Sequence, residues 1–171
     1  YLKNGFTQAG FFKESVNFDR GYEDPVHSIR RQSEGVYAML HFLAYERENG
    51  RRHPEWEQKM KNMLDILLQL QHEDGSFPRK FHDDNSGGST PSATLPLIMG
   101  YKYFKDKRYL ASAKRTADYL EKVLISKADY FSSTLDANCE DKEASLYAAT
   151  ATYYLSLITK GDEHRHYADL T

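Results

Sequence analysis

The chain has 171 residues and a mass of 19.8 kDa, the size of one ordinary domain. Hydrophobic residues make up 40% of it, aromatic residues 13%, and there are only 10 Gly and 5 Pro, which excludes collagen-like, low-complexity and disordered classes. Lys and Arg total 23 against 25 Asp and Glu, for a net charge of −2. The chain therefore has no excess of positive charge, and a nucleic-acid partner is not predicted.

Tyrosine is unusually abundant, with 13 residues in a chain whose mean hydropathy is −0.74, which indicates half-wet surfaces or clefts. The single cysteine, Cys139, excludes a disulfide within the chain. No apolar run is long enough for a membrane span. The chain begins with Tyr1, so we expect a processed product or a piece of a longer protein, periplasmic or secreted if a leader was removed.

The first elements in chain order are a loop-rich segment and two helices. Residues 1–24 are aromatic without a clean period, which predicts loop with a short helix at most. From about residue 25 an apolar stripe at three- and four-residue steps predicts a helix that ends at Asn49-Gly50. Pro54 suits the first position of a second helix, which we expect to continue to about His72.

Four more helices follow. A loop to Thr90, a candidate helix cap, precedes a third helix from about Pro91, and a fourth helix is predicted over 107–125. A polar stretch with one short strand-like segment, 130–135, leads to a fifth helix over about 142–159 and a sixth from Asp162. The expected fold class is therefore all-α. Its hairpins fall at about 25–72, 91–126 and 142–171, in one domain over 25–171.

The helix pairs repeat at roughly 50 residues. Trp56, Tyr109 and Tyr167 occupy comparable places in the second helix of each pair, at separations of 53 and 58 residues. A period of this length is typical of stacked helical arrays. Long loops at 1–24, 73–90 and 127–141 alternate with short turns, so antiparallel helices place all three at the same end, where sites are usually built.

The turn that runs from Gln71 to Phe77, Gln-His-Glu-Asp-Gly-Ser-Phe, resembles the Gln-x-x-Asp-Gly-x-aromatic turn of α/α-toroid proteins. The stretch 106–120 resembles their outer helices. In that fold, inner and outer helices alternate around a barrel of about six hairpins, as in six-hairpin glycosidases, some polysaccharide lyases, sugar epimerases and terpene cyclases. The resemblance covers roughly 30–171 and implies about half of a toroid. Locally, Gly75 permits a positive φ and Phe77 can anchor the loop in the core.

The second and third long loops hold the candidate catalytic carboxylates Asp83, Asp84, Asp136 and Glu140. Glycoside hydrolysis needs two carboxyl groups, one protonated and one ionised, across the scissile bond. Because the loops share one end of the fold, Asp136 paired with Asp83 or Asp84 is the preferred acid–base pair. The structural alternative makes Asp74 a turn residue, and it places Glu140 and Asp141 as caps of the fifth helix.

Candidate substrate-binding residues lie in the same loops. Aromatic rings stack on the C–H faces of sugars, which favours Phe77, Phe81 and Tyr130. His82 adds a proton-transfer group, and Arg79 suits a uronate carboxylate. Each of these residues has a structural alternative, as a loop anchor or a solvated loop charge.

We expect no metal site and no cofactor, because the seven histidines are scattered and Cys139 has no neighbouring histidine. A terpene cyclase is disfavoured because an Asp-Asp-x-x-Asp pattern is absent. The sequence thus predicts a glycoside hydrolase-like fragment that acts on a poly- or oligosaccharide. Alternatives are a polysaccharide lyase of the same fold and a non-catalytic module that binds glycan or protein. The remainder of a larger chain, or a second copy in a homodimer, would cover the open inner face.

Overall fold

The computed structural model describes residues 5–14, 16–17, 19, 22–23, 27–80, 89–129, 131–133 and 138–171. In this part of the chain the fold is all-α and consists of three antiparallel helical hairpins in two layers. The inner layer holds α1 (Ile29–Glu48), α3 (Ser89–Phe104) and α5 (Lys142–Ile158). The outer layer holds α2 (Pro54–Leu70), α4 (Lys107–Tyr119) and α6 (Asp162–Asp169). Inner and outer helices therefore alternate along the chain.

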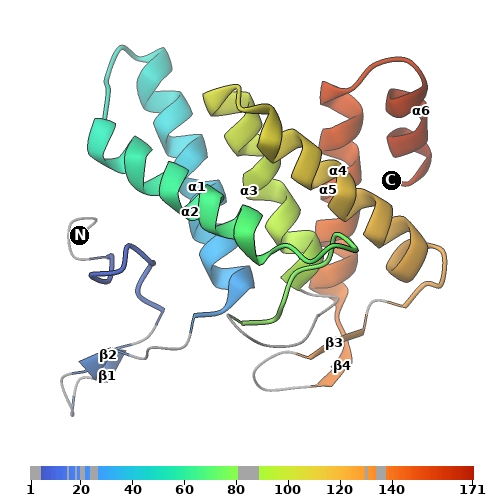
Figure 1. Ribbon diagram of the computed structural model, residues 1–171, viewed down its shortest axis with the longest axis horizontal. Helices are drawn as coiled ribbons and strands as arrows, with labels where there is room; N and C mark the ends of the chain where they lie inside the picture. Colours follow the sequence, from blue (N-terminus) through green and yellow to red (C-terminus); the bar gives the residue numbers. More distant parts are fainter. Residues whose placement is uncertain are drawn as a thin grey trace.

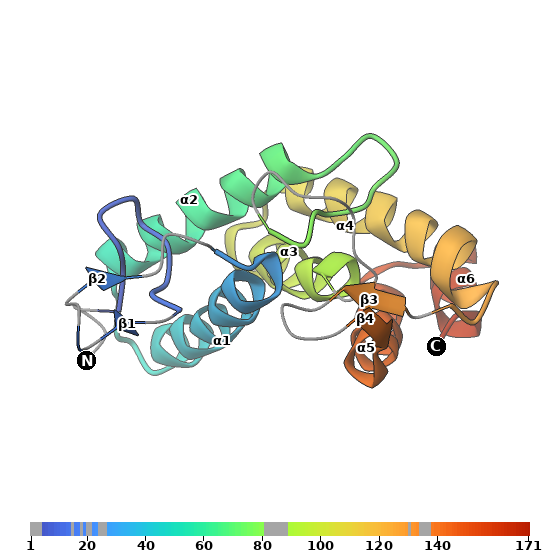
Figure 2. The same ribbon diagram turned by 90° about the horizontal axis from the view of Figure 1, so that it is seen from below.

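The two layers curve into an arc. The central helix α3 packs against α1 on one side and α5 on the other, and it also contacts α2 and α4 behind it. Figure 2 shows this curvature, with α1 and α5 at the ends of the inner layer and α2 and α4 on the convex side. The inner layer thus presents a concave face flanked by α1 and α5.

Local chemistry explains where the helices begin. The Ser28 hydroxyl accepts a hydrogen bond from the Arg31 N–H at the start of α1, and the Asp106 carboxylate accepts one from the Arg108 N–H at the start of α4. Asp141 caps α5 by accepting from two backbone N–H groups, as one alternative predicted. The helix α2 begins at Pro54, whose missing N–H costs nothing in the first turn.

The connections differ at the two ends of the arc. Short turns join α1 to α2, α3 to α4 and α5 to α6, and they lie at the upper end in Figure 1. The described parts of the long connections, including the loop after α2 and the strands β3 and β4, lie at the opposite end. The prediction that the long loops share one end is therefore confirmed for these parts, and this end is called the loop end below.

Three helix boundaries differ from the predictions. The first helix begins at Ile29, after its Ser28 cap, rather than near residue 25. The third begins at Ser89, so Thr90 is a helical residue and not a cap; its hydroxyl bonds the N–H and the carbonyl of Phe77 at 2.9 and 3.2 Å. The fourth ends as a π-helix, η2 (Leu120–Ile125), in which Ser126 N–H donates to the Glu121 carbonyl five residues earlier.

Short strands border the loop end. Near the N-terminus, β1 (Val16–Asn17) pairs antiparallel with β2 (Tyr22–Glu23), and the expected short helix is not found among the described residues of 1–24. The strand-like segment 130–135 contains β3 (Phe131–Ser133), which pairs with β4 (Asn138–Glu140), a strand that the sequence did not predict. This hairpin leads directly into α5.

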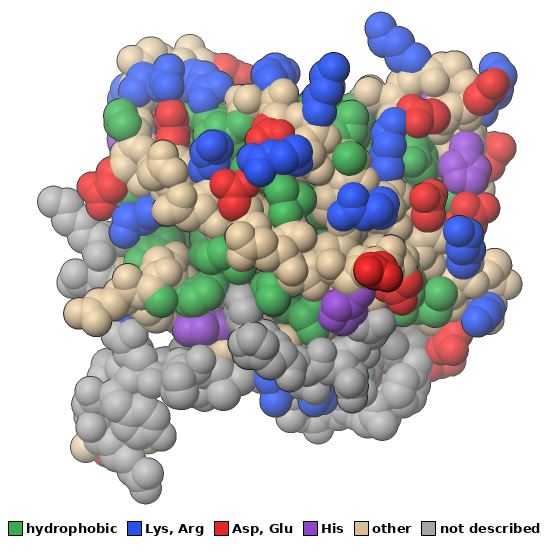
Figure 3. All heavy atoms as spheres, in the orientation of Figure 1, with side chains coloured by type: hydrophobic (Ala, Val, Ile, Leu, Met, Phe, Trp, Pro, Cys, Tyr) green, Lys and Arg blue, Asp and Glu red, His purple; other side chains and the backbone are tan. Residues whose placement is uncertain are grey.

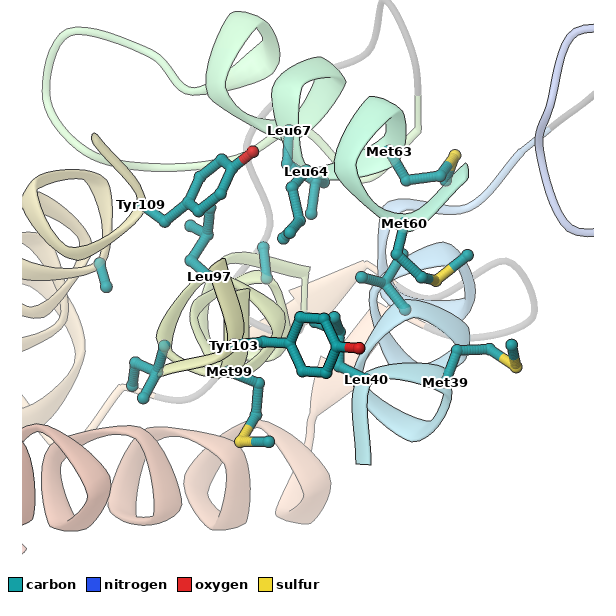
Figure 4. Packing of buried hydrophobic residues seen from close by; sticks show 14 of the residues in the cluster. Met39, Leu40, Met60, Met63, Leu64, Leu67, Leu97, Met99, Tyr103 and Tyr109 are labelled. Atoms are coloured by element: carbon teal, nitrogen blue, oxygen red, sulfur yellow. The ribbon is translucent and has the colours of Figure 1, made fainter. Parts of the chain in front are cut away.

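The hydrophobic core lies between the two layers and consists mainly of residues from α1, α2, α3 and α4, several of which are labelled in Figure 4. The outer-helix aromatics take the places that the repeat predicts: Tyr109 and Tyr167 are buried, and Trp56 packs against the same core. Tyr109 also donates a hydrogen bond to the Asp65 carboxylate at 3.0 Å. Each hairpin therefore fixes its outer helix with one large aromatic ring.

The face shown in Figure 3 carries basic and acidic side chains intermixed over the outer helices. Several are ion-paired, such as Arg108 with Asp65 and Asp106, and Lys114 with Glu163. Among the described residues, no helix has the length and apolarity to cross a membrane.

Candidate functional site

The predicted catalytic carboxylates fall unevenly on the described structure. Asp83, Asp84 and Asp136 lie outside the described residues. Glu140 is the last residue of β4; it is exposed and directly precedes the Asp141 cap of α5. The structure therefore places one candidate acid at the loop end, beside the start of an inner helix.

Only some of the predicted substrate-binding residues lie within the described part of the chain. Phe81, His82 and Tyr130 also lie outside the described residues. Phe77 is fully buried in the hydrophobic core, so the prediction that its ring stacks on substrate is wrong and its alternative role as a loop anchor holds. Arg79 is half-buried, and its backbone carbonyl accepts a hydrogen bond from the Ile29 N–H at 3.1 Å. Arg79 thereby ties the loop after α2 to the first turn of α1.

The Asp-Gly turn that begins this loop is held against α4. The Gln71 amide donates to the Ser112 carbonyl at 3.0 Å and to the Thr116 hydroxyl at 2.8 Å, and the Ser112 hydroxyl donates back to it at 2.7 Å. Gly75 has φ +94° and lies so close to α4 that a Cβ would sit 2.2 Å from the Arg115 carbonyl oxygen. The turn thus sets the point at which the loop leaves the outer layer.

Asp74 acts inside this turn. Its carboxylate accepts from the Ser76 N–H at 3.0 Å and from the Ser76 hydroxyl at 2.6 Å, and these bonds help to hold its pKa below the usual value although partial burial opposes them. The expectation that Asp74 is a turn residue is confirmed. The carboxylate also borders a hollow of about 370 Å³ on the outer side, whose other charged lining residues include Arg115, Asp118 and Lys122.

A row of polar and aromatic side chains, which the sequence did not predict, crosses the concave face. It consists of Arg30, Glu34, Tyr37 and His41 from α1 and Glu143, Tyr147 and Tyr154 from α5. Arg30 pairs with Glu143, the Tyr147 hydroxyl donates to Glu34, and the Tyr37 and Tyr154 hydroxyls are 3.3 Å apart. These contacts join the two flanking helices across α3.

Two tyrosines of the row, Tyr37 and Tyr147, hold their protons more tightly than usual. Burial, reinforced by the Tyr154 hydroxyl, raises the pKa of Tyr37 far above its usual range, and burial together with Glu34 does the same for Tyr147. Burial and the nearby Lys102 charge lower the pKa of His41, whose ring packs edge-on against Tyr37 at 4.5 Å. The raised pKa values of Tyr37 and Tyr147 and the lowered pKa of His41 all favour the neutral forms of these side chains.

The chemistry of this row suits polar, uncharged ligands. Tyrosine offers both a ring face and a hydroxyl, which sugars can use at once. The Glu34 side chain is 44% exposed and that of Glu143 is 59% exposed, so each keeps carboxylate surface free for further hydrogen bonds. No group of three or more potential metal ligands occurs in the described part of the chain.

The spacing of the row's residues in the sequence is a signal for a shared helix face. Arg30, Glu34, Tyr37 and His41 recur at steps of four, three and four residues, which is the helical period on a face beside the apolar stripe. Glu143 and Tyr147 of α5 have the same four-residue step. Each helix alone looks like an ordinary polar face with packing aromatics. Only the placement of α1 and α5 on both sides of α3 brings the two stripes together.

Comparison with known proteins identifies a solved structure with a similar fold. No protein-family profile matches this sequence. A solved structure described as "a possible member of GH105 family" from Salmonella enterica serovar Paratyphi A is similar, with a TM-score of 0.70 at 13% identity. The likeness covers 90% of this chain and 47% of that one.

The fold is that of an α/α toroid. The chain spans about half the length of the solved structure that it matches, as expected for three hairpins. At 13% identity the likeness concerns the fold alone, so the site rests on the residues of this chain.

Proposed function

We propose that this chain is a glycoside hydrolase-like, carbohydrate-active protein that acts on a poly- or oligosaccharide by carboxylate acid–base chemistry. The observation that carries the proposal is the structural likeness to a possible GH105 family member over 90% of the chain. GH105 is a glycoside hydrolase family, and the alternation of inner and outer helices supports a site on the concave side or at the loop end.

The proposed catalytic pair comes from the carboxylates of the loop end, Asp136 with Asp83 or Asp84, and Glu140 as the further candidate. Glu140 adjoins the first turn of α5, where Glu143 begins the concave row. A saccharide that lies along the row would extend toward this end of the inner helices. One carboxyl group would protonate the glycosidic oxygen while the other acts as base or nucleophile.

Ligand contacts are proposed both at the loop end and along the concave row. Arg79, Phe81, His82 and Tyr130 would bind sugar at the loop end, as the sequence predicts, and the tyrosines of the concave row would bind it deeper. Neutral hydroxyl donors suit sugar hydroxyls, because such bonds desolvate no additional charge.

A glycan screen tests the proposal. The purified chain is incubated with a panel of neutral and acidic poly- and oligosaccharides, and both new reducing ends and ultraviolet-absorbing unsaturated products are measured. Reducing ends without unsaturation are the expected result. Unsaturated products would instead identify a lyase, and binding of a glycan without any product would identify a non-catalytic module.

A further inference from the structure

The hollow on the outer side of the fold is not used by the proposed carbohydrate site. Its volume is about 370 Å³, which lies within the range of roughly 300–1,000 Å³ that ligand sites occupy. The Asp-Gly turn and the end of α4 line it together, with Glu73, Asp74, Arg115, Asp118, Tyr119, Lys122 and Val123. None of these residues belongs to the concave row or to the loop-end candidates, so the hollow is a separate feature of the surface.

One wall of the hollow is a single helix face. Arg115, Asp118, Tyr119 and Lys122 follow one another at steps of three, one and three residues, which brings them to the same side of the helix. The helix changes from α to π at Leu120, inside this face. A π-turn that continues an α-helix is rare and frequently accompanies a functional site. The helix geometry is therefore unusual where the hollow lies.

The opposite wall is held in place by the turn. The Asp74 carboxylate is fixed by its two hydrogen bonds from Ser76, and Gly75 lies directly against the α4 backbone. Arg115 donates a hydrogen bond to the Gln71 side chain. These contacts form the hollow in advance of any ligand, which lowers the entropic cost of binding one.

Three charged side chains of the lining have no partner in the protein. Among the described residues, Glu73, Asp118 and Lys122 take part in no ion pair and no side-chain hydrogen bond. An Asp four residues before a Lys has the orientation that favours an ion pair on a helix, yet no such pair joins Asp118 and Lys122 in the described structure. A hollow with uncompensated charges of both signs suits a ligand that itself carries both signs.

Ligands of simpler charge fit this lining less well. No group of three or more potential metal ligands occurs in the described part of the chain, so the carboxylates do not converge on a metal ion. A simple anion would face Glu73 and Asp118 as well as Lys122, and a simple amine would leave Lys122 unpaired. A neutral sugar would hydrogen-bond to the lining but would not balance its charges.

We propose that the hollow binds a free amino acid in its zwitterionic form. The ammonium group pairs with Asp118 and Glu73, and the carboxylate group pairs with Lys122. Tyr119 and Val123 provide the apolar surface for the side chain of the ligand. Because the ligand joins the Asp-Gly turn to η2, it stabilises the folded state and raises the Tm. This inference does not depend on the proposed function, since it concerns different residues and a different ligand.

Thermal unfolding of the 171-residue chain in the presence of each standard amino acid tests the proposal. At least one amino acid is expected to raise the Tm and to bind saturably in isothermal titration calorimetry. Its amide lacks the carboxylate charge and its N-acetyl derivative lacks the ammonium charge, so each should bind about tenfold more weakly or worse. Binding of no amino acid, or equal binding of the three forms, would overturn the proposal, whatever the outcome of the glycan screen.

Two variants that each remove one charge locate the binding site. Lys122→Met and Asp118→Asn are each expected to weaken binding about tenfold or more, because each loses one charge pair with the ligand. Lys127→Met is the matched control, since Lys127 is exposed and lies outside the lining of the hollow. Unchanged binding in either Lys122→Met or Asp118→Asn would contradict the assigned contacts and overturn the proposal. Circular dichroism checks that each variant is folded.

Discussion

Gly75 and Gln71 show how single residues position a loop. The φ of Gly75, +94°, is one that residues with a Cβ rarely adopt, and the backbone of α4 fills the space where a Cβ would be. Gln71 spans the same contact with its side-chain amide. Together they fix the start of the loop whose later residues, 81–88, hold two of the candidate catalytic carboxylates.

Gly75→Ala is predicted to destabilise the fold by about 3 kcal/mol or more, since it combines an unfavourable φ with a steric clash against backbone. Gly50→Ala is the matched control: its φ is +75° but nothing lies within 4 Å of a Cβ there. It should cost only about 1 kcal/mol. Chemical denaturation measures both values, and equal losses would show that the contact with α4 is unimportant.

Glu46 couples stability to pH. Hydrogen bonds from Arg51 and then from His53 lower the pKa of the Glu46 carboxyl from 4.5 to about 2. A carboxyl whose pKa is lower in the folded state stabilises it above the unfolded value and loses that contribution as the pH falls through the folded value. Glu46→Gln should therefore lower the Tm at pH 5 and make little difference near pH 2. A Tm difference that is constant over this range would contradict the assignment.

The packing of α2 on α3 depends on a small residue where the helices meet. At Gly100 a Cβ would lie 2.6 Å from Leu64 Cδ1 and 3.3 Å from Tyr109 Cδ2. Glycine costs helical stability at this position but lets α3 approach the outer layer. The inner and outer helices are thus held close by the pairing of a large residue with a missing side chain.

A double-mutant cycle tests this pairing. Leu64→Ala should cost about 3 kcal/mol, because it leaves a cavity in a fully buried site. Gly100→Ala is also expected to destabilise, but in the Leu64→Ala background the added methyl group enters the vacated space. The double variant should therefore be more stable than the sum of the single effects by about 1 kcal/mol. Additive effects would mean that the two positions do not share this space.

Sequence patterns predict the existence and order of the helices better than they predict the residues at which the helices begin and end. The apolar stripes, Pro54 and the turn at Asn49-Gly50 gave the helices and their order, because each signal is local. The third helix begins at Ser89, two residues before the predicted start, and the Thr90 hydroxyl bonds Phe77, a tertiary contact that no local signal shows. The predicted substrate contact of Phe77 is wrong for a related reason: a loop position in the sequence does not reveal that its ring reaches the core.

The concave row shows what the sequence withholds about a site. Its residues have ordinary helical spacing, and their meaning depends on α1 and α5 lying in step on both sides of α3. The opposite holds for the loop-end carboxylates. Their positions in long polar loops make them candidates from the sequence, but Asp83, Asp84 and Asp136 lie outside the described residues. The candidate site therefore combines an observed row with carboxylates that remain a prediction.

The whole molecule is an arc of an α/α toroid, and its function is proposed to depend on both the concave face and the loop end. A curved double layer gives the inner helices α1, α3 and α5 a shared concave face. It also places the starts of the inner helices at the loop end (Figure 1), where Glu140 directly precedes the Asp141 cap of α5. Loss of the loop-end carboxyl groups should thus abolish turnover without loss of folding.

The most direct measurement is the turnover of the glycan identified in the screen by Asp136→Asn, Asp83→Asn, Asp84→Asn and Glu140→Gln. Glu55→Gln is the control, a carboxyl that is 77% exposed at the far end of the fold. We predict that Asp136→Asn and one of the other three variants lose about 10²- to 10⁴-fold in kcat with unchanged Tm, while the control keeps full activity. Full activity in all four variants would contradict carboxylate catalysis at the loop end.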